Sequence, residues 1–267
     1  MTVKDALRGS GLPAAEAEVL LSRVLRRERP WLLSHAQDEL TPEEWGEFAR
    51  WTERRRKQEP VAYIIGEQEF YGRPFTVDRR VLIPRPATEG IVRRTLQFLQ
   101  DGVDAVDTVD EGIVVIAKNI QRGSSTLVRT PTAFAYVVDV GTGSGCIAIT
   151  LALERPDLRI IATDISPDAL AVARMNAERH GVAHRIAFRE GNGLAPVKNL
   201  TEAFLLVSNP PYIPSGNDLM ADVKDFEPHV ALFGGADGHA VVRELQQQAE
   251  AHPSCIGWVM EYGTVAP

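Results

Sequence analysis

Apolar positions follow a helical repeat near the N-terminus of the chain. Over residues 14–25 they recur at helical spacing, and Thr41-Pro42-Glu43-Glu44 predicts a capping box with proline at the first helical position. Four cations at residues 54–57 stand at the C-terminal end of the helix that this capping box begins, where positive charge suits the helix dipole. We therefore interpret them as the last turn of that helix rather than as a nucleic-acid patch. We expect a small helical domain over residues 1–62.

Residues 63–84 show a different pattern. Short β-type runs, Tyr63-Ile64-Ile65 and Phe75-Thr76-Val77, stand close to Gly66, Gly72 and Pro74. This mixture predicts a linker that carries a β-hairpin.

From residue 85 to residue 267, strand-like and helical segments alternate. Strands are predicted at 136–140, 159–163, 185–189, 204–208 and 256–262, and helices are predicted to end near residues 154 and 180. The alternation indicates an α/β fold with a doubly wound, mostly parallel sheet. Residues 101–135 interrupt it with one strand-like run at 113–116, and we interpret them as an insertion or mobile connector.

Composition narrows the function classes. The chain has 267 residues, of which 44% are hydrophobic, and a formal net charge of -7, so direct nucleic-acid binding is disfavoured. Its two cysteines, Cys146 and Cys255, lack zinc-site spacing and are expected to be buried, and no metal is predicted. No signal peptide or membrane span is predicted, which favours the cytoplasm.

A glycine-rich turn follows the first of the predicted parallel strands. Gly141-Thr142-Gly143-Ser144-Gly145 lets the backbone approach a ligand and leads into a helix with free N–H groups, and its tight spacing favours S-adenosylmethionine over a dinucleotide. Asp164 ends the next strand, where a carboxylate reaches ribose hydroxyls, while Ser166 is the better helix cap. After the third strand, Asn192 and Gly193 are expected to border the adenine, although a simple turn is also consistent with them.

The run Asn209-Pro210-Pro211-Tyr212 follows the fourth strand, at the edge where ligands of such sheets bind. An amide nitrogen is a poor nucleophile, but the side-chain carbonyl of Asn209 and the backbone carbonyl of Pro210 can grip both of its hydrogens. Pro210 and Pro211 stiffen the loop, and Tyr212 offers a ring for stacking. Asn209, Pro210 and Tyr212 are therefore the predicted catalytic residues, and all four residues are predicted to bind the substrate. The alternative is a proline-stiffened turn.

Several motifs resemble those of the bacterial protein-(glutamine-N5) methyltransferases that modify peptide chain release factors. They are Glu59-Pro60-Val61-Ala62-Tyr63-Ile64-Ile65-Gly66, Glu69-Phe70-Tyr71-Gly72, Leu82-Ile83-Pro84-Arg85-Pro86, the glycine turn, Asn209 to Tyr212, and Phe226-Glu227-Pro228-His229-Val230-Ala231-Leu232-Phe233-Gly234-Gly235. The resemblance covers most of the chain.

The resemblance implies a class I S-adenosylmethionine-dependent methyltransferase with a Rossmann-like fold, acting on the glutamine of a release factor's Gly-Gly-Gln loop. By position, Gly141, Thr142, Gly143, Ser144, Gly145, Asp164, Asn192, Gly193 and Asn209 would bind the cofactor. The N-terminal domain would recognise the release factor.

This chain differs from the family pattern in three respects. Ala87 and Asn192 stand where acidic residues are usual, and the connector at 101–135 is longer. The family's closing β-hairpin is expected to be missing after the strand at 256–262, which would leave an exposed sheet edge and either a protein less stable than its relatives or one that borrows cover from a partner.

Three other functions are kept open. They are glutamine methylation of a ribosomal protein, adenine-N6 methylation of DNA, and a catalytically idle binding module. The context of Ile83-Pro84-Arg85-Pro86 favours the release-factor branch, and a basic, aromatic target-recognition region for DNA is not evident.

Overall fold

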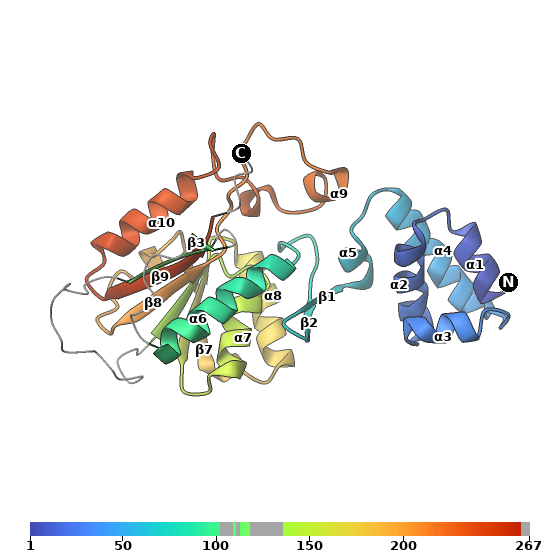
Figure 1. Ribbon diagram of the computed structural model, residues 1–267, viewed down its shortest axis with the longest axis horizontal. Helices are drawn as coiled ribbons and strands as arrows, with labels where there is room; N and C mark the ends of the chain where they lie inside the picture. Colours follow the sequence, from blue (N-terminus) through green and yellow to red (C-terminus); the bar gives the residue numbers. More distant parts are fainter. Residues whose placement is uncertain (102–108, 111–112, 118–135, 263–267) are drawn as a thin grey trace. The chain divides into compact units, whose positions relative to one another are not determined.

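The computed structural model describes residues 1–101, 109–110, 113–117 and 136–262 (Figure 1). The chain divides into two units, one formed by residues 1–67 and 219–226 and the other by residues 68–218 and 227–267. Most of the predicted insertion at 101–135 therefore lies outside the described residues.

The first unit is helical. It contains α1 (Val3–Gly9), α2 (Ala14–Leu25), α3 (Arg29–Ser34), α4 (Pro42–Arg56), α5 (Val61–Ile65) and α9 (Ala221–Lys224). The predicted capping box is confirmed, because the Thr41 hydroxyl accepts from the Glu44 N–H and the Glu44 carboxylate accepts from the Thr41 N–H. Leu20, Leu21 and Phe48 are buried between these helices.

The cations at the end of α4 have structural partners within this unit. Arg55 donates to the Glu16 carboxylate at 2.7 Å and lies 3.6 Å from that of Asp222. Arg54 makes a bidentate pair with Glu59. Ion pairs thus connect the end of α4 to α2, to α9 and to the residues before α5, in agreement with the structural interpretation of this basic run.

The prediction of a β-type run at Tyr63-Ile64-Ile65 is wrong, since these residues form α5. Pro60, with φ of -55°, leads into the helix, and Gly66 ends it in the left-handed conformation. The three apolar residues allow either structure by their pattern, and the one turn of helix buries Tyr63 and Ile64. The predicted hairpin is confirmed further on, as β1 (Glu67–Phe70) paired with β2 (Arg73–Thr76).

The second unit contains a seven-stranded sheet in the order β3-β4-β9-β8-β5-β6-β7. The strands are β3 (Val109–Asp110), β4 (Ile113–Ala117), β5 (Tyr136–Val140), β6 (Arg159–Asp164), β7 (Ile186–Glu190), β8 (Phe204–Ser208) and β9 (Cys255–Glu261). The five strands from β9 to β7 are parallel. The order and the crossover helices are those of the class I methyltransferase fold.

Helices cover both faces of this sheet (Figure 1). They are α6 (Glu89–Asp101), α7 (Cys146–Glu154), α8 (Pro167–Arg179) and α10 (Ala240–Ala251), with short 3-10 turns η1 (Pro86–Thr88), η2 (Ala183–Arg185), η3 (Ala195–Val197) and η4 (His229–Ala231). Both cysteines are buried, as predicted.

Alternate residues of each central strand face opposite sides, as the period of a strand requires. Val137 and Leu205 pack in the cluster beneath α6 and α7, whereas Val138 and Leu206 pack beneath α10. Each fully buried aliphatic side chain contributes about 1.5–3 kcal/mol to folding. Burial on both faces explains why β5 and β8 are apolar almost throughout.

The expectation of an exposed edge beside β9 is wrong. Strand β4 pairs antiparallel with β9, from Ile113 opposite Glu261 to Ala117 opposite Gly257. The strand-like run predicted at 113–116, within the segment 101–135, forms β4 and is the neighbour of β9. Its N–H and C=O groups satisfy those of β9 on the side away from β8.

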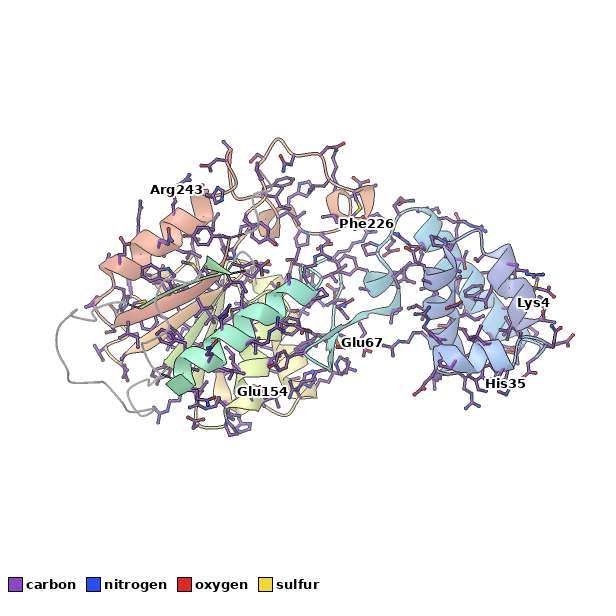
Figure 2. All side chains as sticks on the ribbon, in the orientation of Figure 1. Lys4, His35, Glu67, Glu154, Phe226 and Arg243 are labelled. Atoms are coloured by element: carbon purple, nitrogen blue, oxygen red, sulfur yellow. The ribbon has the colours of Figure 1, made fainter. Side chains whose placement is uncertain are left out.

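The hairpin is fixed to the sheet layer by polar contacts of Asn176 and Glu154. Asn176 of α8 accepts from the Thr76 N–H and donates to the carbonyls of Thr76 and Ser144. Glu154, labelled in Figure 2, lies at the end of α7. Its carboxylate accepts from Arg73 at 2.6 Å. These contacts hold the glycine turn, α8 and the hairpin together on one side of the site.

Candidate active site

The glycine turn lies at the carboxyl end of β5, and its glycines serve two purposes. Gly141 and Gly143 have φ of 71° and 55°, and a Cβ on either would meet no atom within 4 Å. Gly145 also has a positive φ, but its Cβ would come within 2.9 Å of Ile149 and 3.2 Å of Ala173. The first two glycines thus give the turn its shape and leave open space beside it, and the third permits close packing of α7 on α8.

Asp164 is anchored beside this turn. Its carboxylate accepts from the Gly143 N–H and the Ser166 N–H, both at 2.9 Å. Ser166 caps α8 by accepting from the Ala169 N–H, as predicted. Burial raises the pKa of Asp164, and the backbone donors oppose that rise. Because each carboxylate oxygen can accept more than one hydrogen bond, the fixed Asp164 can still accept from a ligand hydroxyl.

Asp139 lies deeper, in the middle of the layer. It is fully buried, and burial raises its pKa to about 7. One carboxylate oxygen accepts from the Thr142 hydroxyl at 2.6 Å and from the Ala148 N–H at 3.2 Å. Asp139 thereby holds both ends of the glycine turn.

Asn192 and Gly193 follow β7. Asn192 donates to the Glu244 carboxylate at 3.4 Å, and Glu244 in turn accepts from Gln248. Gly193 has φ of 54°, and a Cβ there would collide with the Gln248 amide. Gln248 also accepts from the Leu194 N–H at 2.7 Å. Helix α10 thus fixes this turn, and Leu194 packs in the apolar cluster beneath it.

The run from Asn209 to Tyr212 leaves the carboxyl end of β8 and is supported by the segment at 232–238. Ile213 donates to the Leu232 carbonyl and accepts from the Gly234 N–H. A Cβ on Gly234 would collide with the Pro211 carbonyl, and one on Gly238 with the Tyr212 carbonyl. Glycine is needed at both positions because the two backbones touch.

A buried polar network holds two side chains of this run. The Asn209 side-chain N–H donates to the Thr88 hydroxyl at 2.8 Å, and that hydroxyl donates to Glu261 at 3.1 Å. The Tyr212 hydroxyl donates to the other oxygen of Glu261 at 2.8 Å. Burial raises the pKa of Tyr212, with Glu261 adding to the effect, so the phenol keeps its proton.

The segment before Thr88 is anchored by a second carboxylate. Glu227 is buried and accepts from Arg85 at 2.5 Å and from the Ile83 N–H at 3.3 Å. Its partner Arg85 is partly exposed, and its charge opposes the rise in the pKa of Tyr212. Two of the family-like motifs, at 82–86 and 226–235, are therefore joined by this pair.

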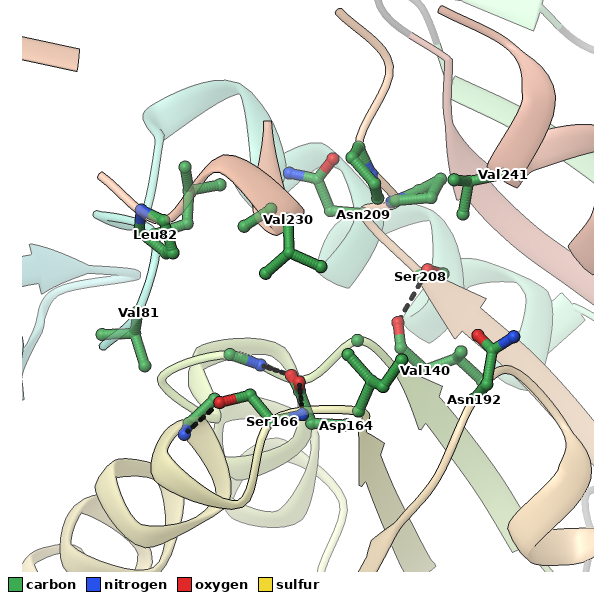
Figure 3. Close-up of a pocket in the computed structure, with 18 of the residues that line it drawn as sticks. Val81, Leu82, Val140, Asp164, Ser166, Asn192, Ser208, Asn209, Val230 and Val241 are labelled. Atoms are coloured by element: carbon green, nitrogen blue, oxygen red, sulfur yellow. Dashed lines mark hydrogen bonds between the residues drawn. The ribbon is translucent and has the colours of Figure 1, made fainter. Parts of the chain in front are cut away.

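These elements enclose one pocket (Figure 3). Of the predicted site residues, Gly141, Gly143, Asp164, Asn192, Gly193, Asn209, Pro210 and Pro211 line it. Asp164 and Asn209 lie on opposite sides of the space in Figure 3. Thr142 and Ser144 are buried instead, Gly145 packs against α8, and Tyr212 points to Glu261.

Sequence reasoning missed much of the apolar wall. Val81, Leu82, Ile165, Val230, Val241 and Leu245 also line the pocket. Ile165 and Val230 are 53% and 59% exposed, so both offer apolar surface to a molecule bound in the pocket. The position of Ile165 directly after Asp164 is the only signal in the sequence that points to it.

The chain is similar to known proteins over most of its length. Residues 2–66 match the model of the PrmC N-terminal domain, and residues 100–225 match the methyltransferase small domain. The release factor glutamine methyltransferase of Koribacter versatilis is 37% identical, over 94% of this chain and 79% of its own length. The chain belongs to the release factor glutamine methyltransferase family.

Other members of the release factor glutamine methyltransferase family show the same likeness. The enzyme of Chlorobaculum tepidum is 40% identical over 82% of this chain and 68% of its own length. The enzyme of Geobacter sulfurreducens is 37% identical over 92% of this chain and 75% of its own length. The resemblance drawn from the motifs is confirmed, and the chain is a methyltransferase.

No helix in residues 1–101 and 136–262 is long and apolar enough to cross a bilayer. The described side chains also contain no group of three His, Cys, Asp or Glu residues placed to hold a metal ion.

Proposed function

We propose that this methyltransferase transfers the methyl group of S-adenosylmethionine to the side-chain amide nitrogen of the glutamine in the Gly-Gly-Gln motif of peptide chain release factors. The observation that carries the proposal is the pocket itself. It brings Asp164 and the glycine turn together with Asn209 and Pro210. The residues proposed to bind the methyl donor and those proposed to bind the methyl-accepting amide therefore line the same pocket.

The described residues fit S-adenosylmethionine. Asp164 is held by two backbone N–H groups and presents its carboxylate at the pocket wall, where it can accept from the ribose hydroxyls. Gly141 and Gly143 leave open space over the turn for the methionine part. Asn192 and Gly193 would border the adenine, and Ile165, which lines the same pocket, would offer it an apolar contact.

The target amide would be held by acceptors. The Asn209 side-chain N–H is already bound to Thr88, so its carbonyl oxygen is the atom left to accept from the substrate. The Pro210 carbonyl accepts the second amide hydrogen. Pro210 and Pro211 have no N–H that could compete for these acceptors.

Bound S-adenosylmethionine supplies an electrophilic methyl group on a sulfonium sulfur. The chain's contribution is to fix the amide nitrogen in line with that group and to exclude water with Leu82, Val230 and Leu245. As the N–CH₃ bond forms, the S–CH₃ bond breaks and S-adenosylhomocysteine is the leaving product; the strongly acidic methylated nitrogen loses its proton to solvent only after the transfer. We assign no general base to the described residues, because positioning and desolvation suffice for this transfer.

The test is transfer of a labelled methyl group. The chain is incubated with labelled S-adenosylmethionine and a release factor, with the same factor carrying alanine for the loop glutamine, with ribosomal protein, or with duplex DNA. Label should appear on the unaltered release factor alone. Label on the altered factor, on ribosomal protein or on DNA would refute the assignment.

Asn209→Ala sharpens this test. Because the side chain grips the target, the transfer rate should fall about 100- to 1000-fold, the usual effect of removing one polar group that stabilises a transition state. The resemblance also places Asn209 beside the cofactor, so affinity for S-adenosylhomocysteine, measured by calorimetry, should fall far less than the transfer rate does. Asn217→Ala, an exposed asparagine of the same connection, is the control. Undiminished transfer by Asn209→Ala would rule out the gripping role.

A further inference from the structure

The network around Glu261 joins residues that are far apart in the chain. Thr88 ends η1, Asn209 and Tyr212 follow β8, and Glu261 ends β9. Thr88 is 3% exposed and Glu261 is 4% exposed, so water does not compete for these contacts. None of the contacts is needed to complete a helix or a strand.

The direction of each hydrogen bond in the network is fixed by the groups involved. An ionised carboxylate only accepts hydrogen bonds, and a hydroxyl has one hydrogen. The Thr88 hydroxyl gives that hydrogen to Glu261 at 3.1 Å. It can therefore offer only a lone pair to Asn209.

This polarity decides which way the Asn209 amide faces. A lone pair on Thr88 accepts from the Asn209 N–H at 2.8 Å. If the amide were flipped, its carbonyl oxygen would stand against the Thr88 oxygen with no hydrogen between them, and a hydrogen bond would be lost. The carbonyl of Asn209 must then lie on the side of the amide away from Thr88.

We infer that Thr88, oriented by Glu261, is a positioning residue that sets the amide of Asn209 so that its carbonyl oxygen receives the target glutamine. The orientation of the Asn209 amide follows from the hydrogen bonds alone, whereas its effect on methyl transfer rests on the proposed function. Tyr212 is held by the same carboxylate, so one buried group orients two of the four residues in the Asn209–Tyr212 run.

Thr88→Val tests the inference, because valine keeps the shape of threonine without the hydroxyl. The amide of Asn209 loses its preferred orientation, and single-turnover transfer to the release factor should fall about tenfold, the worth of one such hydrogen bond. Affinity for S-adenosylhomocysteine should stay within about twofold. Thr88→Ser restores the hydroxyl and should restore the rate.

Thr95→Val is the matched control. Thr95 lies on α6, is completely buried, and has no hydrogen-bond partner for its hydroxyl in the described part of the chain. The same substitution there should leave transfer and cofactor affinity unchanged. An equal loss in both valine variants would mean that the effect of Thr88 is general packing, and would overturn the inference.

A second readout does not depend on activity. The side-chain amide protons of Asn209, assigned in nitrogen-15 spectra by their absence from Asn209→Ala, should exchange faster with water in Thr88→Val and at the wild-type rate in Thr95→Val. Unchanged exchange in Thr88→Val overturns the inference even if the wild type proves inactive. Absence of transfer by the wild type would refute the proposed function instead. Thr88→Ala serves for both readouts if the valine variant does not fold.

Discussion

Replacing Asp164 by asparagine should weaken cofactor binding and fold stability by separable amounts. The carboxylate accepts from Gly143 and Ser166, one bond to each oxygen. An asparagine keeps one acceptor and turns an NH₂ group toward the other backbone N–H. That N–H loses its partner in a half-buried place, so the free energy of unfolding should fall by about 1–3 kcal/mol.

The effect on the ligand follows from the same atoms. A hydrogen bond from a ribose hydroxyl to a charged acceptor contributes about 1.5–3 kcal/mol, and asparagine removes the charge and one acceptor. The dissociation constant of S-adenosylhomocysteine should therefore rise about 10- to 100-fold. Calorimetric titration gives the affinity, and urea unfolding of the free protein gives the stability.

Asp168→Asn is the control for charge. It removes the same charge from the exposed first turn of α8, where an acid contributes about 0.3–1 kcal/mol through the helix dipole. Ligand affinity should change by less than about twofold. Wild-type affinity in Asp164→Asn would refute the ribose role, and an equal loss in both variants would indicate long-range electrostatics instead of a direct contact.

Two further substitutions test the supporting structure. Gly234→Ala should lower the methyl-transfer rate about tenfold or more, because the new Cβ would displace the Pro211 carbonyl. Gly216→Ala, where a Cβ meets open space, should leave the rate unchanged. Transfer assays of the two variants in parallel test this difference. Asp139, whose pKa is raised to about 7 by burial, binds its proton more tightly in the folded chain, so its contribution makes the free energy of unfolding fall as pH rises from about 4 to about 7. Asp139→Asn should remove that component, and an unchanged slope in urea unfolding across this range would contradict the assignment.

Much of the sheet was predictable because its pattern is local. The runs 136–140 and 204–208 were located to the residue as β5 and β8, since β-branched and apolar residues stand between clear turn signals. The strand prediction at Tyr63-Ile64-Ile65 was wrong because three consecutive apolar residues show neither a strand period nor a helix period. The flanking Pro60 and Gly66 suit a single helical turn as well as they suit a strand.

The candidate site divides in the same way. Gly141, Asp164 and Asn209 could be predicted to line one pocket, because each ends or directly follows a strand at the ligand-binding edge of the sheet. Thr88 and Glu261 were missed, because the two hydrogen bonds that link residues 88, 209 and 261 depend on how three distant segments meet. Conversely, Thr142 and Ser144 belong to the motif but are buried in the turn, since neighbouring residues of a turn face different directions.

The pairing of β4 with β9 has a consequence for heat inactivation. Ile113, the first residue of β4, stands opposite Glu261, and its side chain reaches so close to Gly90 that a Cβ there would lie 2.5 Å away. Strand β4 thus pairs with the end of β9 that carries Glu261 and also contacts the start of α6, next to Thr88. Parts of a domain open locally at free energies below that of global unfolding. Methyl transfer should therefore decline on warming several degrees before the sheet unfolds, through loosening of a strand that touches neither substrate.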